Sequence, residues 1–330
     1  MKAGEGAKLS AIVVSAGGAD AVRPTLEALA AQTALDRMQL VLVSPVEIDP
    51  ADALLAPFGS VTLVRRELDT LGRSIAAGFL AASAPVVAYA EEHSLPEAAW
   101  AETLIDRHRG PWVAVGWSLA NANPATAASW AHLLTDFGPG VRPVRSGERT
   151  GSMPWHHVSY KRDALAPYGE SLGEAYEAEG LLQDDLVARG GRLFMEGGVS
   201  SRHINISRLR WNLRSHFYGG RGYGAARADH ASWSPARRLA FAAAFPLVPI
   251  VRLKRLREDV ARTRAERGRK AGLLPSIAVN LLANAFGEAV GYLTGPGPAR
   301  HDRLPMELER RRYLGPRDDF TVALTPGSSR

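Results

Sequence analysis

The stretch TLGRSIAAGFLAASAPVVAYAEEH (residues 70–93) joins an amphipathic run, an apolar run and an acidic end. We predict a helix over 70–83 and a buried strand over 84–90, because the apolar spacing changes from helical to continuous. A strand that directly follows a helix is typical of βαβ units and therefore of a largely parallel sheet. Glu91, Glu92 and His93 stand where this strand ends. They form either an ordinary polar strand end or a site for a metal and a charged ligand.

The same alternation of strands and helices extends on both sides of this stretch. Further strands are predicted over 10–16, 38–45, 60–66, 111–119 and 192–198. Further helices are predicted over 21–33, 95–108 and 172–191. Residues 137–154 are rich in Gly, Pro and Arg, and we predict a long loop there. We therefore expect an α/β protein with a mainly parallel sheet flanked by helices.

Composition limits the chemistry that the chain can perform. Its 330 residues are 46% hydrophobic and 22% charged, which indicates a globular protein. The chain contains no Cys, which excludes disulfides and thiolate metal sites and leaves His, Asp and Glu as metal ligands. The N-terminal apolar run is short and is predicted as a strand, not as a signal peptide. There is no run of about 20 uncharged apolar residues, so we expect no simple transmembrane helix and a cytoplasmic location.

The C-terminal part differs from the rest in composition. Residues 252–270 contain nine Lys/Arg and three Asp/Glu, and this excess of +6 equals the formal net charge of the whole chain. Apolar runs flank this basic segment over 239–251 and 273–293. Because the basic residues are confined to one segment, a general nucleic-acid-binding surface is disfavoured. The segment could bind an anionic membrane surface or form the solvated face of a helix. We expect residues 226–330 to form a helical appendage that is either membrane-peripheral or a packing or homodimer surface.

The order of these segments resembles a family-2-type glycosyltransferase with a GT-A fold, over roughly residues 9–210. The helix containing TLEALAAQT (25–33) is similar to the first βα unit of that family, and LGRSIAAG (71–78) to its Gly-containing helix. YAEEH (89–93) then falls where the family has an Asp-x-Asp motif. The resemblance implies that residues 1–225 form a GT-A-like domain that transfers a sugar from a nucleotide-sugar donor with inversion.

The resemblance also implies a divalent metal, Mn²⁺ or Mg²⁺, that neutralises the departing diphosphate. Glu91 takes the place of the first Asp, toward the ribose or the metal, and His93 takes the place of the second, as a metal ligand. Because Asp-x-Asp has become Glu-x-His, an ion that accepts imidazole is favoured, and metal independence stays open. His203, in SRHINIS (201–207), matches a His that the family uses as a further metal ligand or diphosphate contact.

The catalytic base of the family corresponds to Glu179 when the sequence is counted back from Gly190. A carboxylate there would take the proton of the acceptor hydroxyl as it attacks the anomeric carbon. The alternative interpretation of Glu179 is part of a solvated acidic helix face. That interpretation is favoured for Asp184 and Asp185, which follow in the same helix.

The remaining site residues are placed by their position in the family pattern. On the donor side they are Ser15 in the first loop, Glu47 in place of the base-reading Asp, Arg73 near the Gly-containing helix, and Arg221 in a basic arm over 208–227. This segment is either a mobile arm that hinges at its glycines or a structural amphipathic segment. On the acceptor side they are Trp155, His156 and His157. The family most commonly uses UDP-sugars, so UDP is the expected nucleotide.

Two other functions stay open at this stage. A non-catalytic relative would bind a nucleotide sugar or a partner protein, and the altered metal and base-reading motifs favour it. A nucleotidyltransferase would share the βαβ start, but SAGGADAVRP (15–24) is a poor match to its basic phosphate loop. For an enzyme, we expect a hexosyltransferase acting on a saccharide or lipid-linked acceptor, as in cell-envelope polysaccharide synthesis.

Overall fold

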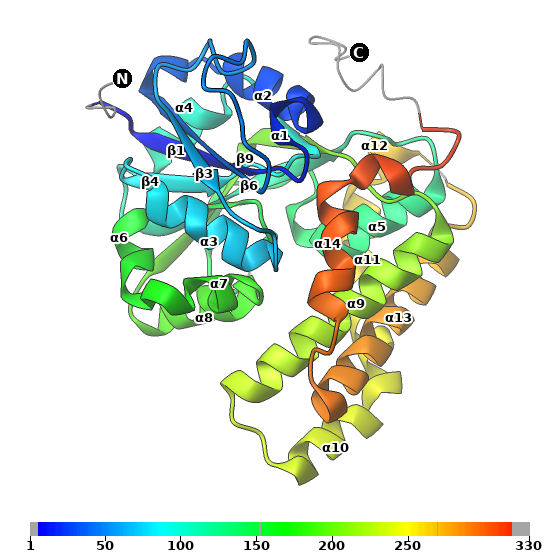
Figure 1. Cartoon of the computed structure of the whole chain (residues 1–330). Helices are drawn as coiled ribbons and strands as arrows, with labels where there is room; N and C mark the ends of the chain where they lie inside the picture. Colours follow the sequence, from blue (N-terminus) through cyan, green and yellow to red (C-terminus); the bar gives the residue numbers. More distant parts are fainter. Residues whose placement is uncertain (1–5, 152, 269, 319–330) are drawn as a thin grey trace. The chain divides into compact units, whose positions relative to one another are not determined.

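The computed structural model describes residues 6–151, 153–268 and 270–318, and its contacts divide the chain into two compact units (Figure 1). The first, here called the sheet unit, comprises Met1–Ala120 and Val144–Arg202. The second, the helical unit, comprises Asn121–Pro143 and His203–Arg330. The sequence placed a single boundary after residue 225. The structure differs because α5 (Ala127–Phe137) and α9 (Leu209–His230) pack on the long helix α13 (Leu273–Thr294).

The sheet runs in the order β3-β2-β1-β4-β8-β6-β9-β5, with β7 paired to β9. Its N-terminal half is parallel, because β1 pairs in parallel with β2 and β4, and β2 with β3. β8 lies antiparallel between β4 and β6. The strand bounds are β1 Leu9–Val14, β2 Met38–Ser44, β3 Val61–Arg65, β4 Val86–Tyr89, β5 Ser94–Pro96, β6 Trp112–Asn121, β7 Gly147–Arg149, β8 Val158–Lys161 and β9 Arg192–His203.

The strand order reverses at β1, since β2 and β3 lie on one side of it and β4 on the other. In open α/β sheets, ligands bind at such a reversal, outside the carboxyl ends of the strands. Ser15 follows β1 and Glu91 follows β4 at this edge. The α/β fold with a sheet flanked by helices and C-terminal helices, predicted from the sequence, is therefore confirmed.

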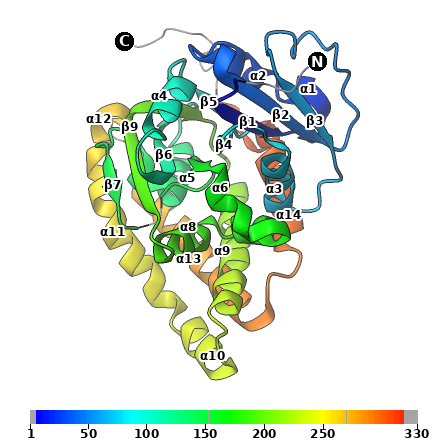
Figure 2. The same ribbon diagram turned by 90° about the vertical axis from the view of Figure 1, so that its left-hand side faces the viewer.

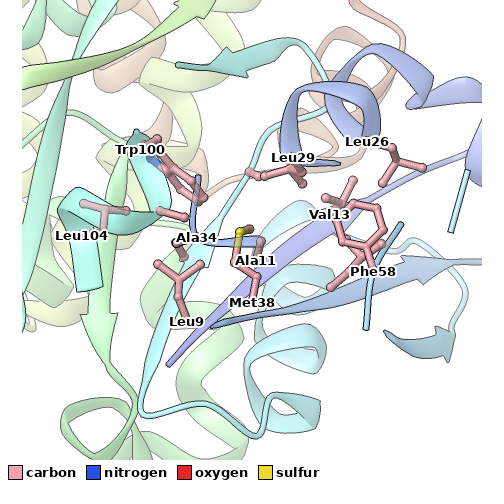
Figure 3. Close-up of a cluster of buried hydrophobic side chains, with 14 of the residues drawn as sticks. Leu9, Ala11, Val13, Leu26, Leu29, Ala34, Met38, Phe58, Trp100 and Leu104 are labelled. Carbon is pink, nitrogen blue, oxygen red and sulfur yellow. The ribbon is translucent and has the colours of Figure 1, made fainter. Parts of the chain in front are cut away.

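Alternating side chains of the central strands form two apolar faces. Leu9, Ala11 and Val13 of β1 face a cluster that includes Leu26 and Leu29 of α2 (Arg23–Ala30) and Trp100 and Leu104 of α4 (Trp100–Arg107) (Figure 3). Ile12 points to the other face, where a Cβ on Gly78 of α3 (Leu71–Ala81) would lie 2.4 Å from its Cγ2. Thr70 caps α3 by accepting a hydrogen bond from the backbone N–H of Arg73. This close helix contact fixes the parallel half of the sheet.

Three predicted elements differ from the structure. The helix predicted over 95–108 begins later, as α4, because residues Ser94–Pro96 form the short strand β5. The loop predicted over 137–154 contains β7. The helix predicted over 172–191 is broken into α7 (Leu172–Tyr176) and α8 (Glu179–Ala188), since Ala178 has non-helical φ of −130° and ψ of 56°. This break makes Glu179 the first residue of α8.

The helical unit is built on α9 and α13, which run side by side (Figure 2). A Cβ on Gly220 or Gly287 would lie 2.1 Å from a carbonyl oxygen of the partner helix, at Asn284 or Phe217 respectively. Of the two alternatives for 208–227, the structure favours the structural segment over the mobile arm, because Gly220 and Gly224 are contact points inside a continuous helix. The other helices of this unit are α10 (Pro235–Ala243), α11 (Val248–Arg262), α12 (Arg264–Arg267) and α14 (Ala299–Leu308).

Helix α13 is also relevant to membrane topology. Among the described residues it alone is long and apolar enough to cross a membrane, judged by length and composition, with a mean hydropathy of 1.4 over its best window. Of that window, 44% is buried within the protein.

Candidate functional site

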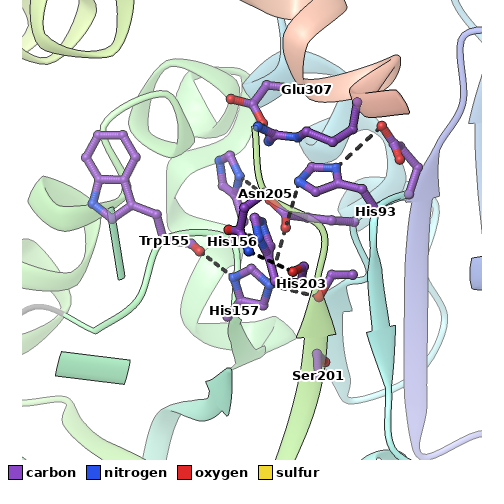
Figure 4. A network of polar contacts seen from close by, with 12 residues as sticks. His93, Trp155, His156, His157, Ser201, His203, Asn205 and Glu307 are labelled. Carbon is purple, nitrogen blue, oxygen red and sulfur yellow. Dashed lines mark hydrogen bonds and ion pairs between the residues drawn. The ribbon is translucent and has the colours of Figure 1, made fainter. Parts of the chain in front are cut away.

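Glu91 lies just beyond β4 and is almost fully buried, with 2% of its side chain exposed. Three imidazoles surround its carboxylate. His93 Nε2 lies 3.5 Å and His157 Nε2 3.3 Å from Oε2, and His156 Nδ1 lies 2.8 Å from Oε1 (the histidines are labelled in Figure 4). The polar strand end of the sequence is therefore a buried cluster of three imidazoles around Glu91, and the Glu92 carboxylate lies 3.4 Å from His93 Nδ1.

The hydrogen bonds of His157 define where its ring can accept a cation. Its Nδ1–H donates to the backbone carbonyl of Trp155 at 2.8 Å (Figure 4). A neutral His157 therefore has its lone pair on Nε2, which faces Glu91 Oε2 and lies 3.0 Å from Ser94 Oγ. The Ser94 hydroxyl can donate to this lone pair. A metal ion between Nε2 and Glu91 Oε2 would instead bind both lone pairs.

The donor set fits a metal. Ligand atoms about 2.1 Å from a tetrahedral ion are about 3.4 Å apart, and the two contacts of Glu91 Oε2 are 3.3 and 3.5 Å. A backbone carbonyl that accepts the second ring N–H, as at His157, is the usual support of a metal-bound imidazole. Imidazole with carboxylate suits Mn²⁺ or Zn²⁺ better than Mg²⁺. Glu91 could thus share an ion with His93 or with His157, and these are the residues of the sheet unit that could contribute metal ligands.

His156 connects two carboxylates. Its backbone N–H donates to Glu179 Oε2 at 2.5 Å, while its ring Nδ1 lies 2.8 Å from Glu91 Oε1. Its φ of 61° is a left-handed conformation that non-glycine residues rarely adopt. The ring also stacks on Tyr176, with the planes 6° apart. A strained residue held by three partners is typical of functional sites.

Glu179 is completely buried at the start of α8. Tyr160 OH donates to its Oε1 at 2.6 Å. Burial raises the pKa of Glu179 above its ordinary value, and the charge of Glu91 adds to this, whereas His156 and Tyr160 oppose it. A carboxyl whose pKa is moved toward neutrality is suited to general acid–base chemistry.

Neighbouring elements fix the position of Glu179. The Gly72 N–H at the start of α3 donates to Glu177 Oε1 at 2.6 Å, two residues before Glu179. Gln183, one turn further along α8, accepts from the Met153 N–H at 2.7 Å and so connects α8 to the segment that contains His156. Gln183 Nε2 also lies 3.4 Å from Tyr160 OH. Tyr160 and Gln183 could not be identified from the sequence, because Tyr160 contacts Glu179 from another element and Gln183 acts through Tyr160 and Met153.

The structure brings together five of the residues predicted for the site: Glu91, His93, His156, His157 and Glu179. His156 and His157, predicted as acceptor contacts, lie against Glu91, and their role toward the acceptor stays a prediction. Trp155 is half-buried beside them. Asp185, taken as a helix-face residue, accepts from Tyr168 OH at 2.5 Å and pairs with Arg189.

The other predicted residues lie elsewhere. Ser15 is buried and donates to the Gly18 carbonyl at 2.6 Å. Glu47 is exposed and pairs with Arg65, and Arg73 is half-exposed and pairs with Asp69 at 3.0 Å. Their donor-binding roles stay predictions.

Two of the predicted residues belong to the helical unit. Arg221 donates through Nε to the Gly295 carbonyl at 3.1 Å, just beyond the end of α13. His203 is buried at the end of β9, where Nδ1 lies 2.8 Å from Asn205 Oδ1 and the ring contacts Phe137. Their roles in donor and metal binding also stay predictions.

No protein-family model and no curated protein matches the chain. Among solved structures, the mannosyltransferase PcManGT from Pyrobaculum calidifontis, in complex with GDP-Man and Mn²⁺, aligns over 87% of both chains with 15% identity and a TM-score of 0.49. S. aureus TarS 1-349 in complex with UDP covers 83% of this chain and 89% of its own, with 13% identity and a TM-score of 0.43. A mycobacterial protein covers 70% and 77%, with 13% identity and a TM-score of 0.45.

The aligned structures thus include a glycosyltransferase, the class whose fold the sequence resembles. At TM-scores below 0.5 these similarities carry no argument about activity. The function is therefore argued from the site.

Proposed function

We propose that the protein is an inverting, metal-assisted glycosyltransferase that uses a nucleotide-sugar donor. The observation that carries this proposal is the pair of carboxylates joined by His156. Glu91 lies among imidazoles and suits a cation, and Glu179 is buried and has a raised pKa. Both lie in the sheet unit, and Glu91 follows β4 where the strand order reverses. Cation binding and proton abstraction are the two tasks of such an enzyme.

Each residue has a definite task in the reaction. Glu91, His93 and His157 would hold the metal, with His203 as a further predicted ligand; when bound, the metal neutralises the charge of the departing diphosphate. Glu179 accepts the proton of the acceptor hydroxyl. The acceptor oxygen then bonds to the anomeric carbon, the bond from that carbon to the diphosphate oxygen breaks, and the configuration inverts. His156 positions both carboxylates and contacts neither bond.

The finer substrate assignments are part of the same proposal. We propose a hexosyl donor with UDP as nucleotide, contacted by Ser15, Glu47, Arg73 and Arg221. The acceptor is a saccharide or a lipid-linked saccharide, with Trp155 as the aromatic side chain beside it, and the product belongs to a cell-envelope polysaccharide. The two imidazole donors favour Mn²⁺ over Mg²⁺. The location proposed is the cytoplasm.

One observation favours a non-catalytic alternative. Glu179 has no exposed surface, and each of its oxygens accepts a hydrogen bond from the protein. A base must reach its substrate, so an enzyme requires α8 or the segment bearing His156 to move when the acceptor binds. A protein that only binds a nucleotide sugar requires no such movement.

Calorimetric titration with UDP-, GDP- and dTDP-sugars, with and without Mn²⁺, tests the proposal. We expect Mn²⁺-dependent binding of one nucleotide class, which His93→Ala and His157→Ala abolish. His301→Ala changes an imidazole that is 81% exposed and serves as the matched control. Glu179→Gln should bind the donor normally and release no free nucleotide. If Glu179→Gln turned over the donor as fast as the wild type, Glu179 would be excluded as the base. If neither the wild type nor this variant turned over any donor, the non-catalytic alternative would be favoured.

A further inference from the structure

We propose that the helical unit binds the surface of a bilayer that contains anionic phospholipid, through the face made by α11, α12 and the start of α13. This proposal concerns a surface, here called the basic groove, that the proposed transfer reaction does not use. It rests on three observations. Exposed apolar side chains are concentrated there, the groove combines apolar with Lys and Arg side chains, and several of these cations form no ion pair with a described side chain.

Exposed apolar side chains are concentrated in this part of the chain. Of the fifteen large apolar side chains that are exposed among the described residues, eleven lie between residues 239 and 293. Leu247 and Ile250, at and beside the start of α11, are 61% and 65% exposed, and Leu274 of α13 is 57% exposed. Side chains of this size scattered singly require no explanation, but a concentration over neighbouring helices marks an interaction surface.

The basic groove contains both kinds of side chain. It has a volume of about 860 Å³, with apolar side chains that include Ile250, Leu253 and Leu274 and five Lys or Arg side chains. Lys254, Arg257 and Arg264 have no ion pair with any carboxylate whose side chain the structure describes, a set that leaves out Glu266. Arg267, by contrast, donates to the carbonyl of Val260 and is part of the groove wall.

This combination favours a bilayer over other occupants. Long cationic side chains beside apolar ones can reach lipid phosphates while the apolar groups enter the acyl region. Nucleic acid would satisfy the cations and leave the apolar side chains in water. A second copy of this chain would bring the same positive charge against it and be repelled. Only an anionic amphiphile matches both components.

Vesicle co-sedimentation of the full chain tests the proposal. We expect binding to phosphatidylcholine vesicles that contain phosphatidylglycerol, and weak binding to phosphatidylcholine alone. Each cation near an anionic surface contributes roughly fivefold to the partitioning of the protein from water to the vesicle.

The triple variant Lys254→Gln/Arg257→Gln/Arg264→Gln should therefore bind anionic vesicles about 100-fold more weakly. Ile250→Ser/Leu274→Ser should also lose binding. The triple variant Arg23→Gln/Arg109→Gln/Arg145→Gln, at exposed positions of the sheet unit, is the matched control and should bind as wild type.

Three results would overturn the proposal. They are equal binding to neutral and anionic vesicles, undiminished binding by the basic-groove triple variant, and release of the protein from vesicles by millimolar inorganic phosphate, which would indicate a site for free anions. Circular dichroism checks that each variant is folded. The nucleotide-sugar titration of the same variants should be unchanged, so failure here and failure of the proposed transferase activity are distinguishable.

Discussion

At the scale of single residues, His156 determines the geometry of the site. Its left-handed backbone is retained because its N–H and its ring hold Glu179 and Glu91. Sequence reasoning identified Glu91, His93 and Glu179 as candidates and assigned His156 and His157 to the acceptor, without placing them beside Glu91. The reason is physical: neither the positive φ of His156 nor the tautomer of His157 is visible in a pattern of residue types.

Substitutions of His156 separate its strain from its contacts. Glycine adopts a positive φ freely, whereas alanine does not, so His156→Gly should be more stable than His156→Ala by roughly 1 kcal/mol. Both variants lose the contact to Glu91, so both should lose most donor turnover. Denaturant unfolding and nucleotide release measure the two effects. Equal stability of the two variants would show that the backbone relaxes at this position.

The raised pKa of Glu179 predicts two pH dependences. Donor turnover should fall on the acid side with a midpoint above 4.5, the ordinary value for a glutamate, because the base must be ionised. The free energy of unfolding should change in the opposite direction, falling as the pH rises. A raised pKa in the folded state favours the protonated form, so this contribution is complete below pH 4.5 and is lost as the pH rises through the raised pKa.

Glu179→Gln provides the comparison for stability. Relative to this variant, the wild type should lose free energy of unfolding as the pH rises above 4.5 and through the raised pKa of Glu179. Urea unfolding of both proteins at several pH values measures the difference. A difference that is constant across this range would contradict the raised pKa.

At the scale of elements, the sequence predicted most strands and helices of the sheet unit, because their apolar periodicity is clear. It missed the break between α7 and α8, since AYEAEG (175–180) contains no proline and only one late glycine. It left open whether the glycines of α9 are hinges or packing positions. In the structure, Gly220 and Gly224 permit another helix to approach closely.

The contact between α9 and α13 gives a stability prediction. A Cβ on Gly224 would lie 2.5 Å from the backbone carbonyl oxygen of Glu288, so Gly224→Val should destabilise the protein by roughly 3 kcal/mol. Gly222 of the same helix has nothing within 4 Å of such a Cβ. Gly222→Ala should therefore be neutral or stabilising by up to about 1 kcal/mol. Thermal unfolding of both variants measures these effects: close helix packing should determine the stability at position 224, and helix propensity the stability at position 222.

At the scale of the whole molecule, the proposed metal couples to stability. Mn²⁺ that binds only the folded protein should stabilise it by about 2.7 kcal/mol at a concentration 100 times its dissociation constant. Differential scanning calorimetry should show a higher Tm with Mn²⁺ for the wild type and no change for His157→Ala. The effect should reverse with a chelator. An equal shift in both proteins would place the ion elsewhere.

The division of the chain into units has a consequence for its synthesis. Helix α5 leaves the ribosome early, but its partner α13 begins at residue 273, so α5 waits for the intervening chain, roughly 10 s at ordinary translation rates. Trp130, Leu133 and Leu134 of α5 are buried in the finished protein and would be exposed during that delay. A nascent chain halted before α13 is therefore a substrate for chaperones, and expression of shortened chains should yield aggregates.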